Sequence, residues 1–130
     1  MSADGRVTAE KIELLRRRAD LVGRARRFFD ARGVLEVDTP LLADGVVVEA
    51  HIDPIPCKVR VGDAAPTERR LLTSPEGPMK RLLAQGSGPI YQFAHAFRDG
   101  EVGRRHAVEF TMLEWYRPGL DHYALMDEVE

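Results

Sequence analysis

The segment 97–116, with the sequence FRDGEVGRRHAVEFTMLEWY, limits the fold of this chain more than any other part of it. It predicts two strands joined by a polar loop, because the residues after the loop alternate between two faces with a period of two. One face of the second strand carries Phe110, Met112, Glu114 and Tyr116. Arg98 ends the first strand and shares a face with Gln92, Ala94 and Ala96. We therefore predict an antiparallel hairpin with room above the small side chains.

The chemical mixture on that face indicates a binding site. An arginine, an aromatic ring, a carboxylate and a phenol are an unusual set for a hydrophobic core. The same groups suit a site that holds a phosphate, a flat base and an amine together. An exposed hairpin with ordinary cross-strand pairs would explain the alternation but not this mixture, so we favour the interpretation as a site.

The rest of the chain predicts an α+β fold with a mainly antiparallel sheet. Apolar residues at helical spacing predict a long helix over 8–32, with Thr8 as its N-cap and Gly33 as its C-cap. We expect short strands over 34–37, 45–48, 55–61 and 69–73, a loop over 63–68, and the hairpin strands over 90–98 and 108–117. A final helix is expected to begin at Asp121.

A second helix is predicted to start at the sequence Ser-Pro-Glu. Ser74 would be its N-cap, Pro75 its first residue, and Glu76 would lie at the positive end of the helix dipole. If Ser74 is the N-cap, Pro78 stands at the position whose N–H would form the first intrahelical hydrogen bond, and proline has no N–H. The sequence is therefore also compatible with a helix that begins later. We expect it to end near Gly86.

Composition excludes several classes of protein. The chain has 130 residues, of which 44% are hydrophobic and 31% charged, and its formal net charge is −2. It is therefore neither a disordered chain nor a purely electrostatic nucleic-acid binder. Cys57 is the single cysteine, which excludes an internal disulfide framework and a cysteine zinc site. No apolar run approaches the ~20 residues of a membrane span, so we expect a soluble, cytoplasmic domain.

Three segments in the same order resemble the class II aminoacyl-tRNA synthetases. The hairpin 97–116 resembles motif 2, and its run EFTMLEWY is similar to the lysyl branch of that family. The run FFDARGVLEVDTPLL over 28–42 resembles motif 1, a long helix followed by a strand that ends in proline. Between them, TSPEGPMKRLL over 73–83 matches the TSPE…MKRLL segment of the same branch.

The resemblance implies an ATP site at the hairpin. Arg98 would bind the α-phosphate and act as the catalytic residue, Phe110 would stack on adenine, and His106 would lie where the motif 2 loop closes over ATP. The family has glutamate two residues after this arginine, whereas the chain has Gly100 there and Glu101 one place later. Glu101 would therefore take over the contact with the adenine amino group after a shift of the loop. The asparagine that contacts ATP in the family is replaced by alanine.

The resemblance also implies a lysine site. Glu76 and Glu114 would hold the α-amino group of the amino acid, and Tyr116 would contact its side chain. Ser74 and Pro75 would shape the same pocket. An ammonium group that is removed from water is stable only when it is paired, so two carboxylates are physically reasonable partners for it.

The implied reaction is ATP-dependent activation of lysine or β-lysine to an adenylate, with Mg²⁺ held by ligands outside this chain. The acceptor would be a lysine of elongation factor P, as in the short lysyl-tRNA synthetase paralogues, or a tRNA. Motif 1 is the dimer interface of the family, so the 8–32 helix and Pro40 would contact a second subunit. No metal site is expected within the chain.

We expect residues 1–130 to be part of a class II catalytic domain, without an anticodon-binding domain. Motifs 1 and 2 are present and nothing in the sequence resembles motif 3. Two alternatives stay open: a non-catalytic module that keeps the dimer surface and binds a partner, or part of a true lysyl-tRNA synthetase.

Five other residues receive structural interpretations. Cys57 is expected to be a small packing residue. His51 and His122 lack partners at metal-ligand spacing. By strand parity His95 faces away from Arg98, and Trp115 is expected to anchor the far side of the sheet.

Overall fold

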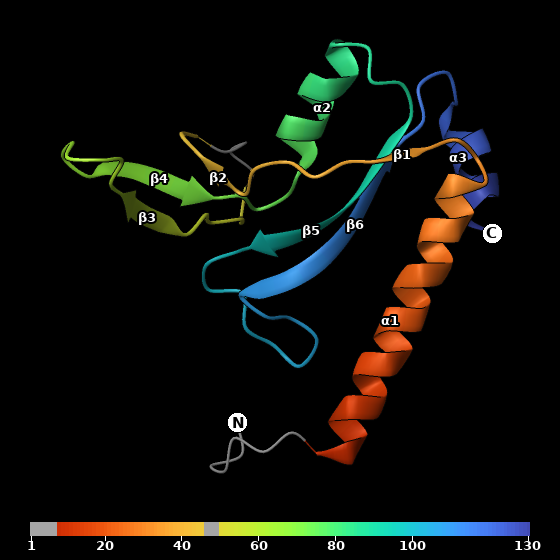
Figure 1. The fold of residues 1–130 in the computed structure, drawn as a ribbon, viewed down its shortest axis with the longest axis horizontal. Helices are drawn as coiled ribbons and strands as arrows, with labels where there is room; N and C mark the ends of the chain where they lie inside the picture. Colours follow the sequence, from red (N-terminus) through yellow and green to blue (C-terminus); the bar gives the residue numbers. More distant parts are fainter. Residues whose placement is uncertain (1–7, 46–49) are drawn as a thin grey trace. The chain divides into compact units, whose positions relative to one another are not determined.

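The computed structural model describes residues 8–45 and 50–130 (Figure 1). The chain divides into two compact units, the first ending at Val34 and the second running over Leu35–Glu130. Within the described residues, no helix has both the length and the apolar character that crossing a membrane requires.

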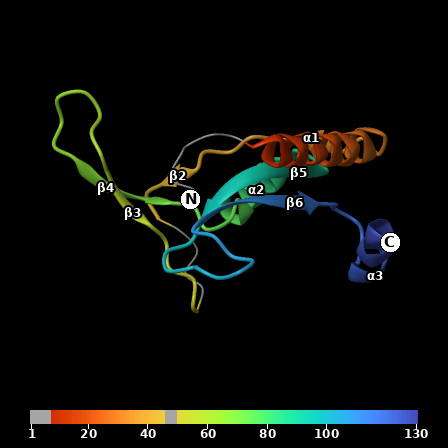
Figure 2. The same cartoon turned by 90° about the horizontal axis from the view of Figure 1, so that it is seen from below.

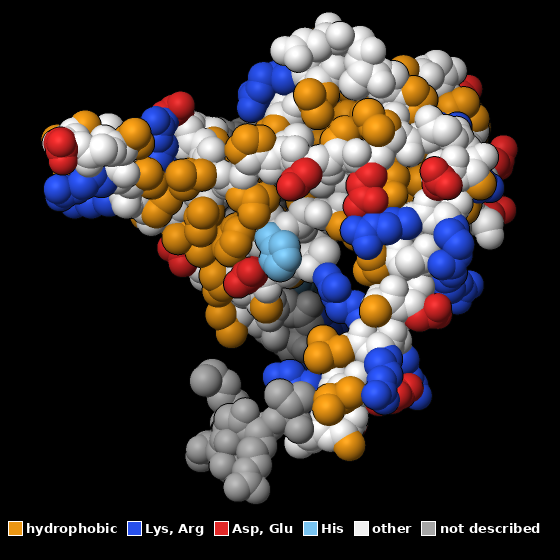
Figure 3. All heavy atoms as spheres, viewed as in Figure 1, with side chains coloured by type: hydrophobic (Ala, Val, Ile, Leu, Met, Phe, Trp, Pro, Cys, Tyr) orange, Lys and Arg blue, Asp and Glu red, His pale blue; other side chains and the backbone are white. Residues whose placement is uncertain are grey.

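The first unit contains the long helix α1, Ala9–Asp30. Thr8 caps it as predicted, because its hydroxyl oxygen accepts a hydrogen bond of 3.2 Å from the Lys11 N–H. The predicted C-cap, Gly33, is wrong, because the helix ends at Asp30 and its C-cap is Ala31. Gly33 follows with a φ of 63°, which favours glycine, and the Val34 N–H bonds the Phe29 carbonyl at 3.0 Å. Figure 3 shows Lys and Arg side chains along this helix, with hydrophobic side chains between them.

The second unit contains a sheet of three strands in the order β1-β5-β6. These strands are β1 (Leu35–Glu36), β5 (Ile90–Phe97) and β6 (Glu109–Tyr116). The predicted hairpin is confirmed, since β5 and β6 are antiparallel over their whole length (Figure 1). Strand β1 is parallel to β5, so the sheet is mainly but not wholly antiparallel.

A second, antiparallel sheet has the order β2-β4-β3. Its strands are β2 (Leu42–Ala43), β3 (Pro56–Val59) and β4 (Thr67–Leu71), and Figure 2 shows β3 and β4 as a hairpin beyond the end of β5. The loop expected over 63–68 is shorter because β4 begins at Thr67. Of the strand expected over 45–48, residues 46–48 lie outside the described residues, and Gly45 is not in a strand.

Helix α2, Glu76–Ala84, begins one residue later than its Ser-Pro-Glu start predicted. Pro75, not Ser74, is the N-cap, and the first intrahelical bond runs from the Met79 N–H to the Pro75 carbonyl at 3.0 Å. The reason is Pro78, which has no N–H and is tolerated only in the first turn, where that group is not bonded. Helix α3, His122–Val129, begins after Asp121 as predicted, and the Asp121 carboxylate accepts from the Ala124 N–H at 2.9 Å.

The expected open space above the small side chains of β5 is filled in the structure. Ala94 and Ala96 are 2% and 0% exposed, and Gln92 is 1% exposed. The chain after β1 lies against Gln92, because the Thr39 hydroxyl donates to Gln92 Oε1 at 2.9 Å. Leu72, the residue after β4, lies at the edge of the same strand, where its carbonyl accepts from the Phe97 N–H at 3.0 Å. Room for a ligand therefore lies beyond this covered part of the sheet.

Candidate functional site

The register of β5 and β6 brings the predicted site residues to one face of the sheet. Phe110 lies opposite Ala96, Glu114 opposite Gln92, and Tyr116 opposite Ile90. Directly opposed residues in an antiparallel pair point to the same side, so the shared face that the alternation predicted is confirmed. Arg98 follows β5 and its N–H bonds the Val108 carbonyl at 2.9 Å, which closes the hairpin loop.

The Arg98 guanidinium is held from three sides. Its Nε donates to the Thr73 carbonyl at 3.3 Å, its Nη1 lies 3.7 Å from Glu101 Oε2, and its Cζ lies 5.1 Å from the centre of the Phe110 ring. The side chain is 22% exposed, so the guanidinium is half-buried but open to a ligand. A planar fork fixed next to an aromatic ring is suited to bind a phosphate beside a stacked base.

A cavity of about 290 Å³ lies against this arginine. Glu101 and His106 line it with Arg98, and His106 Nε2 is 4.0 Å from Glu101 Oε1. The structure thus brings together three of the four residues predicted to bind ATP around one cavity, and the fourth, Phe110, is the ring beside Arg98.

Sequence reasoning gave no site role to His51 and Asp53, which also line this cavity. Their segment is held there by a hydrogen bond of 2.7 Å from the Asp99 N–H to the Asp53 carbonyl. His51 has a φ of 69°, an uncommon backbone conformation for a residue with a Cβ, and such conformations concentrate at functional sites. No sequence pattern links His51 to Arg98, because a backbone bond between distant segments leaves no periodicity.

Gly100 has a structural reason for replacing the expected glutamate. Its φ is 70°, a conformation that costs a residue with a Cβ roughly 1–2 kcal/mol. A Cβ built there meets nothing within 4 Å, so backbone conformation and not crowding favours glycine. With the loop turned in this way, Glu101 is the carboxylate beside Arg98.

Four side chains from α2 and β6 form a second group, which we call the amine cluster: Glu76, Lys80, Glu114 and Tyr116. The Tyr116 hydroxyl donates to Glu114 Oε1 at 2.6 Å, and the Lys80 ammonium pairs with Glu76 Oε1. The pKa of Lys80 is raised, chiefly by the hydrogen bond to Glu76 and its charge and to a smaller extent by the charge of Glu114. Sequence reasoning had named the other three members but not Lys80.

Ser74 and Pro75 connect the arginine to the amine cluster. Pro75 is fully buried and starts α2, whose first residue is Glu76. Thr73, just before them, provides the carbonyl that holds Arg98. One short turn therefore positions both the guanidinium and a carboxylate of the amine cluster.

We expect Tyr116 to stay protonated well above the pH at which a free tyrosine ionises. Burial raises its pKa most, followed by the hydrogen bond to Glu114 and the charges of Glu114 and Glu76. A raised pKa means that the folded state holds this proton more tightly than the unfolded chain, so its contribution to stability is complete below about pH 10 and is lost as the pH rises.

Tyrosinate absorbance measured up to about pH 11 checks this prediction. The Tyr116→Phe variant should show the same rise in absorbance as the unchanged protein. A smaller rise in the variant would mean that Tyr116 ionises normally and that its pKa is not raised.

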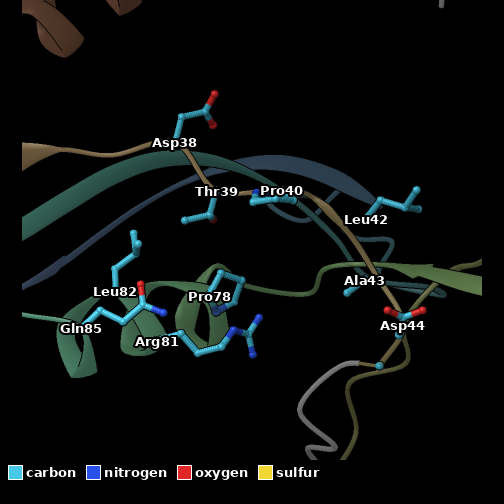
Figure 4. A pocket seen from close by; sticks show the side chains of 11 residues that line it. Asp38, Thr39, Pro40, Leu42, Ala43, Asp44, Pro78, Arg81, Leu82 and Gln85 are labelled. Carbon is cyan, nitrogen blue, oxygen red and sulfur yellow. The ribbon is translucent and has the colours of Figure 1, made fainter. Parts of the chain in front are cut away.

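A further cavity, of about 600 Å³, lies between α2 and the segment that leads into β2 (Figure 4). Pro78, Arg81 and Gln85 line it from α2, and Thr39, Pro40 and Asp44 line it from the other side. Pro40, predicted to contact a second subunit, is exposed on this wall. The sequence did not indicate the cavity, because its walls come from segments far apart in the chain.

No group of three or more His, Cys, Asp or Glu side chains within 8–45 and 50–130 is arranged to hold a metal ion. His95 faces away from Arg98 as predicted, with its Nδ1 3.0 Å from Glu109 Oε1. Trp115 also lies on that opposite face, across from Tyr91, and Cys57 is partly buried in β3.

The comparisons with known proteins identify a family for this chain. Residues 4–130 match the family model described as tRNA synthetases class II (D, K and N). The chain belongs to this family. Its class II synthetase-like domain has the α+β character that the sequence predicted.

Three of the similar proteins carry the same name. The elongation factor P–(R)-beta-lysine ligase of Vibrio vulnificus is 53% identical over 131 residues, which cover 100% of this chain and 40% of that protein. The proteins of the same name from Erwinia tasmaniensis and Sodalis glossinidius are 52% and 51% identical over 117 residues, covering 89% of this chain and 36% of each relative. The chain thus spans less than half the length of these curated relatives, and its resemblance to the lysyl branch is confirmed.

Proposed function

We propose that this chain provides the motif 1 and motif 2 part of a catalytic domain that activates lysine or β-lysine with ATP. The adenylate would then pass its aminoacyl group to a lysine of elongation factor P. The acceptor is suggested by the name of the similar proteins, elongation factor P–(R)-beta-lysine ligase. The chemistry is supported by the site itself.

The observation that carries the proposal is the pairing of Arg98 and Phe110. The guanidinium and the ring lie 5.1 Å apart on the face of the sheet that also holds Glu114 and Tyr116. A nucleotide that stacks on the ring would bring its α-phosphate to the fork of the arginine. An amino acid whose ammonium lies in the amine cluster would approach that phosphate along the same face.

In the proposed reaction, a carboxylate oxygen of the amino acid attacks the α-phosphorus and pyrophosphate leaves. Arg98 offsets the negative charge that grows on the α-phosphate, and it is already oriented by Thr73 and Glu101. Glu76 and Glu114 hold the ammonium so that the carboxylate points at the phosphorus. In the second step the amine of the acceptor lysine attacks the acyl carbon, and AMP leaves.

Mg²⁺ accompanies ATP in phosphoryl-type reactions of this kind. The described residues do not fit a magnesium site, because they contain no suitable group of carboxylates or histidines. No step above therefore depends on a metal held by this chain.

The exchange of labelled pyrophosphate into ATP tests the proposal. We expect the full-length protein to catalyse this exchange only when lysine or β-lysine is present, and the ratio of the two rates identifies the amino acid. Transfer is then followed by the gain in mass of elongation factor P, with tRNA as the competing acceptor. Absence of exchange with both amino acids would contradict the proposal and favour a non-catalytic binding module.

We also propose that α1 forms a homodimer interface. The support is an exposed set of large apolar side chains on this helix: Ile12, Leu14, Leu15 and Leu21 are 41–64% exposed. Exposed apolar side chains gathered on one element are typical of protein–protein interfaces.

A further inference from the structure

We propose that Lys80 is a resident cation of the amine cluster: its ammonium holds the Glu76 carboxylate until the ammonium of a ligand displaces it. This inference rests on the proposed function, because it concerns the same pocket. It makes Lys80 a residue that determines which amines bind.

The position of Lys80 follows from helix geometry. Lys80 stands four residues after Glu76 on α2, so their side chains lie on one face of the helix, one turn apart. The Lys80 ammonium bonds Glu76 Oε1, and the two side chains are 58% and 34% exposed. The carboxylate is thus the less exposed partner, and the ammonium reaches it from the solvent side.

This ion pair is suited to be broken. Pairs between exposed side chains add little stability, because water solvates both groups and the long lysine side chain loses freedom when it is held. An ammonium that also contacts Glu114 would make two charged contacts in place of one. A ligand of this kind can displace Lys80, whose side chain then returns to water.

The charge of Lys80 also sets the attraction that an incoming ammonium experiences. Glu76 and Glu114 carry two negative charges, and Lys80 offsets one of them. Both carboxylates act on Lys80 and also on Tyr116, so the four groups share one local field. Lys80 therefore lowers the affinity of the amine cluster for cations in general. The cluster favours a ligand that makes further contacts, such as an amino acid whose carboxylate lies near Arg98.

The test compares amine binding by the full-length protein and by Lys80→Met, using isothermal titration calorimetry with L-lysine, with β-lysine and with propylamine. Removal of one positive charge near the site should tighten lysine binding about three- to tenfold at low salt. The gain should be larger for propylamine, which lacks the other contacts, and it should shrink as salt is added. Lys80→Arg, which keeps the charge, should bind lysine as the unchanged protein does.

Lys58→Met is the matched control, because Lys58 is an exposed lysine on β3, outside the amine cluster. It should leave both affinities unchanged. Equal or weaker lysine binding by Lys80→Met would overturn the inference and leave the proposed function intact. Equal gains in both Met variants would overturn it as well, since the effect would then reflect net charge. If the unchanged protein binds neither lysine nor β-lysine, the proposed function and the inference both fail.

Discussion

Replacing Arg98 by alanine should reduce lysine-dependent pyrophosphate exchange by about 10²- to 10³-fold, the loss typical of removing one fixed group that stabilises charge in a transition state. The arginine is suited to such a role because its orientation is set before a ligand binds. The Thr73 carbonyl and Glu101 hold the guanidinium, and the Phe110 ring lies beside it. Exchange assays at saturating ATP and lysine separate this loss from a loss of affinity.

Two further variants make the Arg98 prediction specific. Arg98→Lys keeps a positive charge but loses the planar fork, so we expect it to recover only a minor part of the activity. Arg60→Ala removes an exposed arginine next to β3 and should retain full exchange. If Arg98→Ala keeps more than about a tenth of the activity, Arg98 does not perform the role assigned to it.

Replacing Met79 by alanine should lower the free energy of unfolding by about 2–5 kcal/mol, as truncation of a fully buried side chain does. Met79 is 0% exposed and belongs to the first turns of α2. The same helix carries Glu76 and Lys80, so a cavity beneath it would also loosen the amine cluster. Urea denaturation measures the stability, and lysine affinity reports on the cluster.

The matched control for Met79 is Met126, which is 60% exposed on α3. Met126→Ala should change stability by no more than about 0.5 kcal/mol, because surface substitutions seldom have larger effects. Met79→Leu conserves the volume and should cost less than about 1.5 kcal/mol. A cost for Met79→Ala as small as that of the control would show that the packing under α2 contributes little.

The hairpin was predictable from the sequence because its pattern is local. Alternation with a period of two assigns every second side chain to one face, so Phe110, Glu114 and Tyr116 could be grouped without any knowledge of the fold. The start of α1 at Thr8 and the start of α3 after Asp121 were predictable for the same reason, since capping depends on residues only a few positions apart.

Other features were predicted less well because they depend on competing or distant interactions. The start of α2 moved to Pro75 because the missing N–H of Pro78 outweighed the preference for serine as a cap. The face of Ala94 and Ala96 was expected to be open, but both are buried, and Thr39 from the chain after β1 bonds their neighbour Gln92. His51 received no role, since its place beside Arg98 depends on the bond between Asp99 and Asp53.

The sequence by itself determined which residues can form a site, because periodicity and motif order are properties of neighbours along the chain. It grouped an arginine, a ring, a phenol and carboxylates, and it indicated the family to which the chain belongs. Only the tertiary structure decided how these groups are held: Arg98 by the Thr73 carbonyl, and Tyr116 near the charge of Glu76 from helix α2. The physical reason is that polar groups removed from water must find partners, and the partners come from whichever segment packs against them.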